Sequence, residues 1–227
     1  VKAPQVGRHK WVVSFDLNSL YPNLLVQYNM SPETLQHGNY GFKTEGAEDT
    51  INKYLNAQDK SEFINDGFII SFNGAKFTRN FVGVFPKLIK EYYDERVEVK
   101  KLQLAAQKEI QENHTVALEK QIVTLENKQL AIKILLNSLY GALANKHFLY
   151  FEKRLAEGVT LSGQLAIQWA QQAINKSMNK LLNTNNEYVI AIDTDSLYIN
   201  FGPLIEKLAP NNPVAFLDKI CKEHFEP

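Results

Sequence analysis

Two short apolar runs, about 180 residues apart, each end on carboxylates. Residues 12–15 lead into Asp16, and residues 188–192 lead into Asp193 and Asp195. Each run has the pattern of a buried strand that would carry its acids to the tip of a sheet. Aspartates in such a turn also hydrogen-bond their own backbone. Three carboxylates brought together would instead form a hard oxygen site of the kind that Mg²⁺ prefers, and Asp16 at a second strand end favours that interpretation.

A polar stripe lies between the two acidic segments. Gln129, Lys133, Asn137 and Tyr140 recur at helical spacing, while the opposite face of the same stretch is apolar. Such a stripe is often only a solvated helix face. A lysine, an asparagine and a tyrosine without an acidic partner one turn away also suit a ligand that carries phosphate and a flat polar edge.

Two further cations precede this stripe. Arg96 and Lys100 are four residues apart and share one face of a predicted helix. Surface cations of this kind usually pair with nearby acids such as Glu95 or Asp94. If the two predicted helices are antiparallel, however, Arg96, Lys100 and Lys133 converge on one anion, and a triphosphate has enough negative charge for all three.

Tyr21 follows Asp16 by five residues, at the start of a predicted helix. It is either a packed helix-start aromatic or a ring beneath a sugar, where it would clash with a 2′-hydroxyl.

The elements that must position these residues follow from periodicity and turn residues. A strand is predicted over residues 11–17, and a helix containing Pro22 in its first turn runs to about Tyr28. Residues 38–66 are expected to form a surface excursion with a short helix near 48–55, followed by a hairpin around Asn73-Gly74. Long helices are predicted at 85–110, 115–143 and 156–183, with strand, acidic turn and strand over 187–200. The expected fold class is α+β.

The bulk composition excludes little. Lys and Arg total 25 and Asp and Glu total 25, so the net charge argues only weakly against a nucleic-acid partner, and basic residues outnumber acidic ones roughly two to one over residues 119–154. No apolar stretch is long enough to span a membrane. Cys221 is the single cysteine, which fits a reducing cytoplasm. The N-terminal Val suggests part of a longer polypeptide.

At these residues the chain resembles family B DNA polymerases. Residues 14–22 (SFDLNSLYP) are similar to the family's first polymerase motif, residues 133–141 (KILLNSLYG) to its fingers-helix motif, and residues 193–196 (DTDS) to its third motif, in the family's order. Flanking residues 29–34 and 83–86 resemble the T-even-type bacteriophage replicative enzymes in particular. The resemblance covers essentially the whole chain.

The resemblance implies an antiparallel-sheet palm at residues 1–85 and 142–227, with two-helix fingers inserted at 86–141. It implies that Asp16, Asp195 and the backbone carbonyl of Leu17 bind two Mg²⁺ ions, with Mn²⁺ as a possible substitute, and that Asp193 tunes their coordination. It further implies that the backbone N–H groups of Ser19, Leu20 and Tyr21 contact the triphosphate, and that Arg96, Lys100 and Lys133 bind its phosphates. Asn137 would support the incoming nucleotide. Tyr21 would exclude a 2′-hydroxyl, and Tyr140 would contact the minor groove of the nascent base pair.

The implied activity is template-directed transfer of a dNMP from a dNTP to a primer 3′-hydroxyl, with primer–template DNA as partner, together with accessory proteins or further polymerase domains. Ile192 departs from the family pattern, because many relatives have Gly there.

Two alternatives stay open. One is a phosphohydrolase of the Asp-x-Asp type, although that family wants Thr or Val where Leu197 stands. The other is a non-catalytic nucleic-acid module, or one chain of a split polymerase.

Overall fold

The computed structural model describes residues 2–36, 47–57 and 67–225. Helices and two small antiparallel sheets make up these residues, so the α+β prediction is confirmed. The chain divides into two compact units, residues 1–18 with 163–227 and residues 19–162. This division does not follow the predicted palm and fingers boundaries, which stay predictions. The described helices include none that is both long and apolar enough to cross a membrane.

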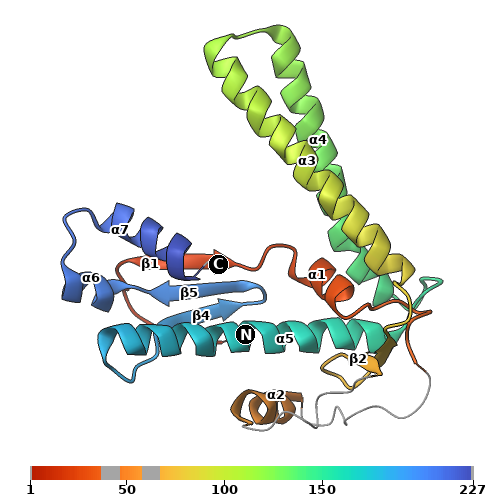
Figure 1. The fold of residues 1–227 in the computed structure, drawn as a ribbon, viewed down its shortest axis with the longest axis horizontal. Coiled ribbons are helices and arrows are strands. Elements are labelled where there is room, and N and C mark those ends of the chain that lie inside the picture. Colours follow the sequence, from red (N-terminus) through yellow and green to blue (C-terminus); the bar gives the residue numbers. More distant parts are fainter. Residues whose placement is uncertain (1, 37–46, 58–66, 226–227) are drawn as a thin grey trace. The chain divides into compact units, whose positions relative to one another are not determined.

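The sheet of the first unit has three strands. They are β1 (Val12–Asp16), β4 (Val189–Asp193) and β5 (Ser196–Asn200), all antiparallel in the order β1-β5-β4. The N-terminal segment runs along the outer side of β4, where the Gln5 N–H donates to the Ile190 carbonyl at 2.9 Å. Because β5 lies between β1 and β4, the acidic ends of both strands lie beside β5 (Figure 1).

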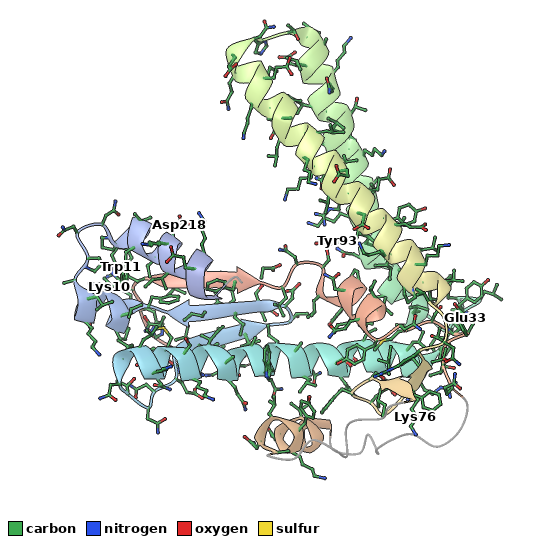
Figure 2. The ribbon with its side chains drawn as sticks, viewed as in Figure 1. Lys10, Trp11, Glu33, Lys76, Tyr93 and Asp218 are labelled. Atoms are coloured by element: carbon green, nitrogen blue, oxygen red, sulfur yellow. The ribbon has the colours of Figure 1, made fainter. Side chains whose placement is uncertain are left out.

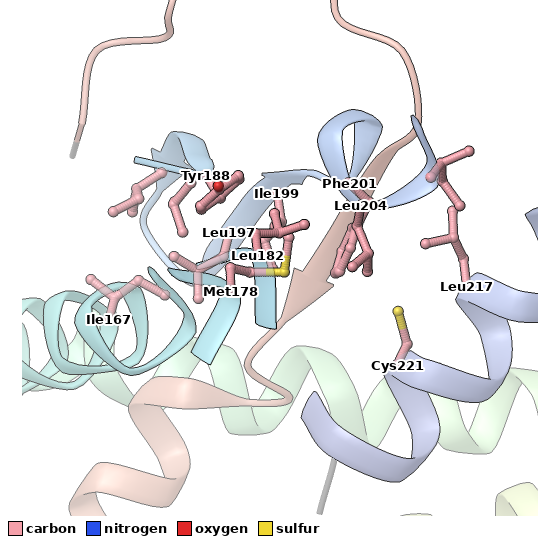
Figure 3. Close-up of a cluster of buried hydrophobic side chains, with 13 residues drawn as sticks. Ile167, Met178, Leu182, Tyr188, Leu197, Ile199, Phe201, Leu204, Leu217 and Cys221 are labelled. Carbon is pink, nitrogen blue, oxygen red and sulfur yellow. The ribbon is translucent and has the colours of Figure 1, made fainter. Parts of the chain in front are cut away.

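Helices cover one face of this sheet. They are the later turns of α5 (Lys153–Leu182), α6 (Gly202–Leu208), α7 (Pro213–Ile220) and a short π-helix, η2 (Cys221–Phe225). Their apolar side chains pack with Leu197 and Ile199 of β5 into one core (Figure 3). The sequence did not predict α6, α7 and η2, because these segments are too short to show a helical period.

Exposure alternates along β1. Val13 and Phe15 pack against the core, whereas Val12, Ser14 and Asp16 are exposed. Trp11, the first residue of the predicted strand, lies outside β1: its side chain is 38% exposed and its φ is 58°. Asp16 therefore stands on the face that the helices leave open.

The second unit begins with α1 (Leu20–Gln27), followed by α2 (Ala47–Asn56), which confirms the short helix expected near residues 48–55. The rest of the predicted excursion lies largely outside the described residues. A hairpin of β2 (Phe68–Ile70) and β3 (Lys76–Thr78) follows. Its loop is longer than the two-residue turn that Asn73-Gly74 predicted, because the buried Asn73 side chain bonds Ser71 and the Arg154 carbonyl.

Two long antiparallel helices complete this unit. They are α3 (Val84–Glu112) and α4 (Val116–Leu143), which pack along their length as predicted (Figure 1). A short turn joins them, and the Thr115 hydroxyl accepts from the Leu118 N–H at the start of α4. Two contacts fix their register: Arg96 Nε lies 3.4 Å from Gln129 Oε1, and Lys128 pairs with Glu95 at 2.7 Å.

Polar contacts hold the first turn of α3. The buried Asn29 side chain accepts from the Gly83 N–H at 2.8 Å, and a Cβ added to Gly83 would lie only 2.6 Å from Ser31 Cβ. Glu33 lies beside the helix start (Figure 2), where its carboxylate accepts from the Val84 N–H and from the Ser31 hydroxyl. Burial alone would raise the pKa of Glu33, but these hydrogen bonds lower it overall. A carboxylate thus caps the positive end of α3.

Candidate functional site

Strand register sets the geometry of the acidic end of the sheet. Asp16 of β1 and Asp193 of β4 both lie opposite Ser196 of the central strand, so the three residues form one row across the sheet. The Leu17 N–H donates to the Asp195 carbonyl at 2.9 Å, which continues the β1–β5 pairing by one residue. The backbone of Asp195 is therefore the direct neighbour of the residue that follows Asp16.

Strand register keeps Asp16 and Asp193 apart, and the grouping of the three predicted carboxylates stays a prediction. Asp16 and Asp193 stand on the two outer strands, about 10 Å apart by the spacing of paired strands. Across residues 2–36, 47–57 and 67–225, no group of three or more Asp, Glu, His or Cys side chains is placed to hold one ion. The sequence pattern located the strand ends correctly. It did not reveal that β5 separates β1 from β4.

Each outer acid has its own hydroxyl partner. Ser196 Oγ donates to Asp16 Oδ2 at 3.1 Å, and Thr194 Oγ1 donates to Asp193 Oδ1 at 3.3 Å. A pocket of about 510 Å³ adjoins Asp16, Leu17 and Asn18, with Ala170 and Ile174 of α5 in its wall. Sequence reasoning missed both hydroxyls. Their presence in residues 193–196 was visible, but only strand register shows which acid each one meets.

The residues next to Leu17 in the chain and across the strand pair carry oxygen donors of the chemical type that Mg²⁺ takes. Mg²⁺ keeps several water ligands and is commonly bound through one or two carboxylates together with substrate phosphate oxygens. Asp16, Asp195 and the Leu17 carbonyl supply two carboxylates and one backbone oxygen, and the 2.9 Å Leu17–Asp195 bond fixes their backbones together. Asp16 is also exposed and so open to a ligand.

The predicted cations lie on the α3–α4 pair of the second unit. With Arg96 beside Gln129, Lys100 lies about one turn toward the α3–α4 connection and Lys133 about one turn toward the other end, so the three span roughly 12 Å. Within the described part of the chain, Arg96, Lys100 and Lys133 pair with no carboxylate.

The neighbouring acids, by contrast, are already neutralised, because Asp94 pairs with Lys90 and Glu95 with Lys128. The three cations therefore form an uncompensated row. Its length suits an extended anion better than a single phosphate.

The two predicted nucleotide-facing tyrosines contact each other. The ring centroids of Tyr21 and Tyr140 are 4.6 Å apart with the planes tilted by 52°, and burial raises the pKa of the Tyr140 hydroxyl. Ser19 precedes α1 with φ 51° and gives that helix no side-chain cap, while Leu20 is buried in its first turn. Asn137 is exposed on α4, one turn from Lys133.

Ile192, which departs from the family pattern, is accommodated in the core. Its side chain is 4% exposed and packs with the apolar residues of β5 and α5. A β-branched residue at this position therefore fits the sheet rather than crowding its open face.

Comparison with known proteins agrees with these features. The sequence profile of DNA polymerase family B matches residues 1–209. The DNA-directed DNA polymerase of Escherichia phage RB69 is 33% identical over 275 aligned residues, covering 100% of this chain and 30% of that protein. That of Enterobacteria phage T4 is 30% identical, covering 99% of this chain and 29% of that protein. A DNA polymerase of Pyrococcus glycovorans is 30% identical over 87% of this chain and 20% of its own length.

The chain belongs to DNA polymerase family B. It is similar to DNA-directed DNA polymerases of bacteriophages, as the segments flanking its motifs had indicated. It spans about 30% of the length of these two phage relatives.

Proposed function

We propose that this chain carries the nucleotidyl-transfer centre of a template-directed DNA polymerase, with residues 1–85 and 142–227 as palm and 86–141 as fingers. The reaction joins a dNMP from a dNTP to a primer 3′-hydroxyl and releases pyrophosphate. One observation carries the proposal: in a family B chain, β1 pairs with β5 so that the backbone of Asp195 meets that of Leu17, next to Asp16.

In this proposal Asp16, Asp195 and the Leu17 carbonyl hold two Mg²⁺ ions, or Mn²⁺ in their place, and Asp193 tunes the site from the far side of β5. When bound, the ions activate the primer hydroxyl and offset charge on the departing pyrophosphate. Asp16 and Asp195 offer carboxylate oxygens, which is the ligand chemistry that such ions require.

The cation row acts on the other end of the substrate. Arg96, Lys100 and Lys133 neutralise the β- and γ-phosphates, and their spacing of about one helical turn distributes the positive charge along the triphosphate. Backbone N–H groups at Ser19, Leu20 and Tyr21 add contacts to the same phosphates, as expected at a helix N-terminus. The absence of competing ion pairs among the described residues supports this assignment.

The tyrosine pair and Asn137 recognise the nucleoside. Tyr21 lies beneath the sugar and excludes a 2′-hydroxyl, Tyr140 faces the minor groove of the nascent base pair, and Asn137 supports the incoming nucleotide. The 4.6 Å contact between the two rings supports a shared task for them.

Single-nucleotide incorporation tests the proposal. The chain is mixed with Mg²⁺ and four primer–templates that differ only in the templating base, and each dNTP is offered in turn. We expect extension only by the complementary dNTP, with stoichiometric pyrophosphate.

Template-independent release of phosphate from a small ester would support the phosphohydrolase instead. Binding of primer–template without incorporation, converted to extension when a relative's remaining domains are added, would identify one chain of a split polymerase.

A further inference from the structure

We propose that Ser196 is a positioning residue that orients the Asp16 carboxylate for metal binding. This inference rests on the proposed function, because it concerns the same acidic end of the sheet. Ser196 occupies the middle of the row and lies opposite both outer acids.

The Ser196 hydroxyl donates its hydrogen bond to one of its two acidic neighbours. A serine hydroxyl has a single proton to donate, and in this structure it goes to Asp16 Oδ2 at 3.1 Å. Asp193 takes its donor from Thr194 instead. The arrangement therefore treats the two acids differently, although both lie opposite Ser196.

The bond leaves one carboxylate oxygen of Asp16 available. Among the described residues, nothing donates to Asp16 Oδ1, so holding Oδ2 by Ser196 limits rotation of the carboxylate and presents Oδ1. At 3.1 Å the bond is longer than the usual charge-assisted O–H···O⁻ contact. Partners that hold a metal-binding carboxylate in this way commonly affect metal affinity strongly.

Binding of Mn²⁺ to the chain, followed by the electron paramagnetic resonance signal of the free ion, tests this without DNA, nucleotide or turnover. We expect Ser196→Ala to weaken Mn²⁺ binding about tenfold. Ser196→Thr keeps the hydroxyl on a strand that tolerates β-branched residues, and should retain affinity within about twofold of wild type. Thr194→Ala is the matched control, because it removes the equivalent bond from Asp193, and it should also stay within about twofold.

Circular dichroism of each variant reports whether the fold is kept. Wild-type affinity in Ser196→Ala overturns the proposal, as does equal weakening in Ser196→Thr, which would mean that shape rather than the hydroxyl matters. A larger effect from Thr194→Ala also overturns it, because Asp193 would then be the principal ligand. Failure of the wild type to bind Mn²⁺ removes the metal site altogether. Normal Mn²⁺ binding with no nucleotide incorporation, even after a relative's remaining domains are added, would contradict the proposed function alone and leave the role of Ser196 intact.

Discussion

At the scale of single residues, strand register places Asp16, Ser196 and Asp193 in one row across the sheet. The apolar runs before Asp16 and Asp193 marked two acidic strand ends, whereas the choice of Asp195 as a metal ligand came from the resemblance to family B polymerases. Sequence alone does not fix the order of strands in a sheet. It therefore could not show that Ser196 lies between Asp16 and Asp193.

The Tyr21–Tyr140 contact leads to a prediction about sugar selection. Tyr21→Ala removes the ring that we place beneath the sugar, so discrimination against ribonucleotides should fall on the order of tenfold. Tyr21→Phe keeps the ring and should leave selectivity nearly unchanged. Competition between dNTP and rNTP in single-nucleotide incorporation measures both variants. Unchanged selectivity in Tyr21→Ala would mean that this ring only packs against Tyr140.

At the scale of elements, the long helices were the most predictable part of the chain. Continuous 3.6-residue periodicity located α3, α4 and α5, with the start of α5 differing by three residues from the expected Ala156. The hairpin was also predicted, but its loop length was not, because a tertiary bond from Asn73 to the Arg154 carbonyl decides it. Here the buried tertiary contact, rather than the turn preference of Asn73-Gly74, sets the length of the loop.

The register of α3 and α4 predicts how the cation row binds nucleotide. Arg96→Ala and Lys133→Ala should each weaken dNTP binding by about 1.5 kcal/mol, or about tenfold in Kd. This is the low end of the range for a hydrogen bond to a charged group, because Lys133 is exposed to solvent. Because both contact one ligand, the double variant should be non-additive.

Lys108→Ala is the control for this pair, since it removes an exposed cation of α3 farther along the helix. Titration of a fluorescent dNTP analogue and of labelled primer–template separates the two affinities. Loss of DNA binding with normal nucleotide affinity would transfer the row from the nucleotide to the template.

The Glu33 cap predicts a pH-dependent stability of the α3 start. Its folded-state pKa is lowered, so the stabilisation is present at pH 7 and is lost as pH falls through the folded pKa. Glu33→Gln should therefore destabilise the first turn by about 0.5–1 kcal/mol near neutral pH and by little once the carboxyl is protonated.

Amide hydrogen exchange at Val84 measures this difference across pH. Glu98→Gln, which removes one partner of the exposed Lys101 pair, is the control and should change little. Equal protection of Val84 in wild type and Glu33→Gln at neutral pH would contradict the cap.

At the scale of the whole molecule, the fold class and the family followed from the sequence, whereas the compact units did not. The units divide at Asn18 and within α5, near Ser162, and a continuous helical pattern contains no sign of such a boundary. The acidic row belongs to the first unit and the cation row to the second, so the proposed reaction assigns a separate task to each.

The central claim is that Asp16 and Asp195, rather than Asp193, hold the ions for nucleotidyl transfer. The most direct test is the rate of single-nucleotide incorporation at saturating Mg²⁺ for Asp16→Asn, Asp195→Asn and Asp193→Asn, three variants with the same change in charge. We expect no measurable incorporation from the first two, because each loses a charged ligand to a hard cation, and a milder loss from Asp193→Asn. Near-normal extension by Asp16→Asn or Asp195→Asn, or a complete loss confined to Asp193→Asn, would contradict the claim.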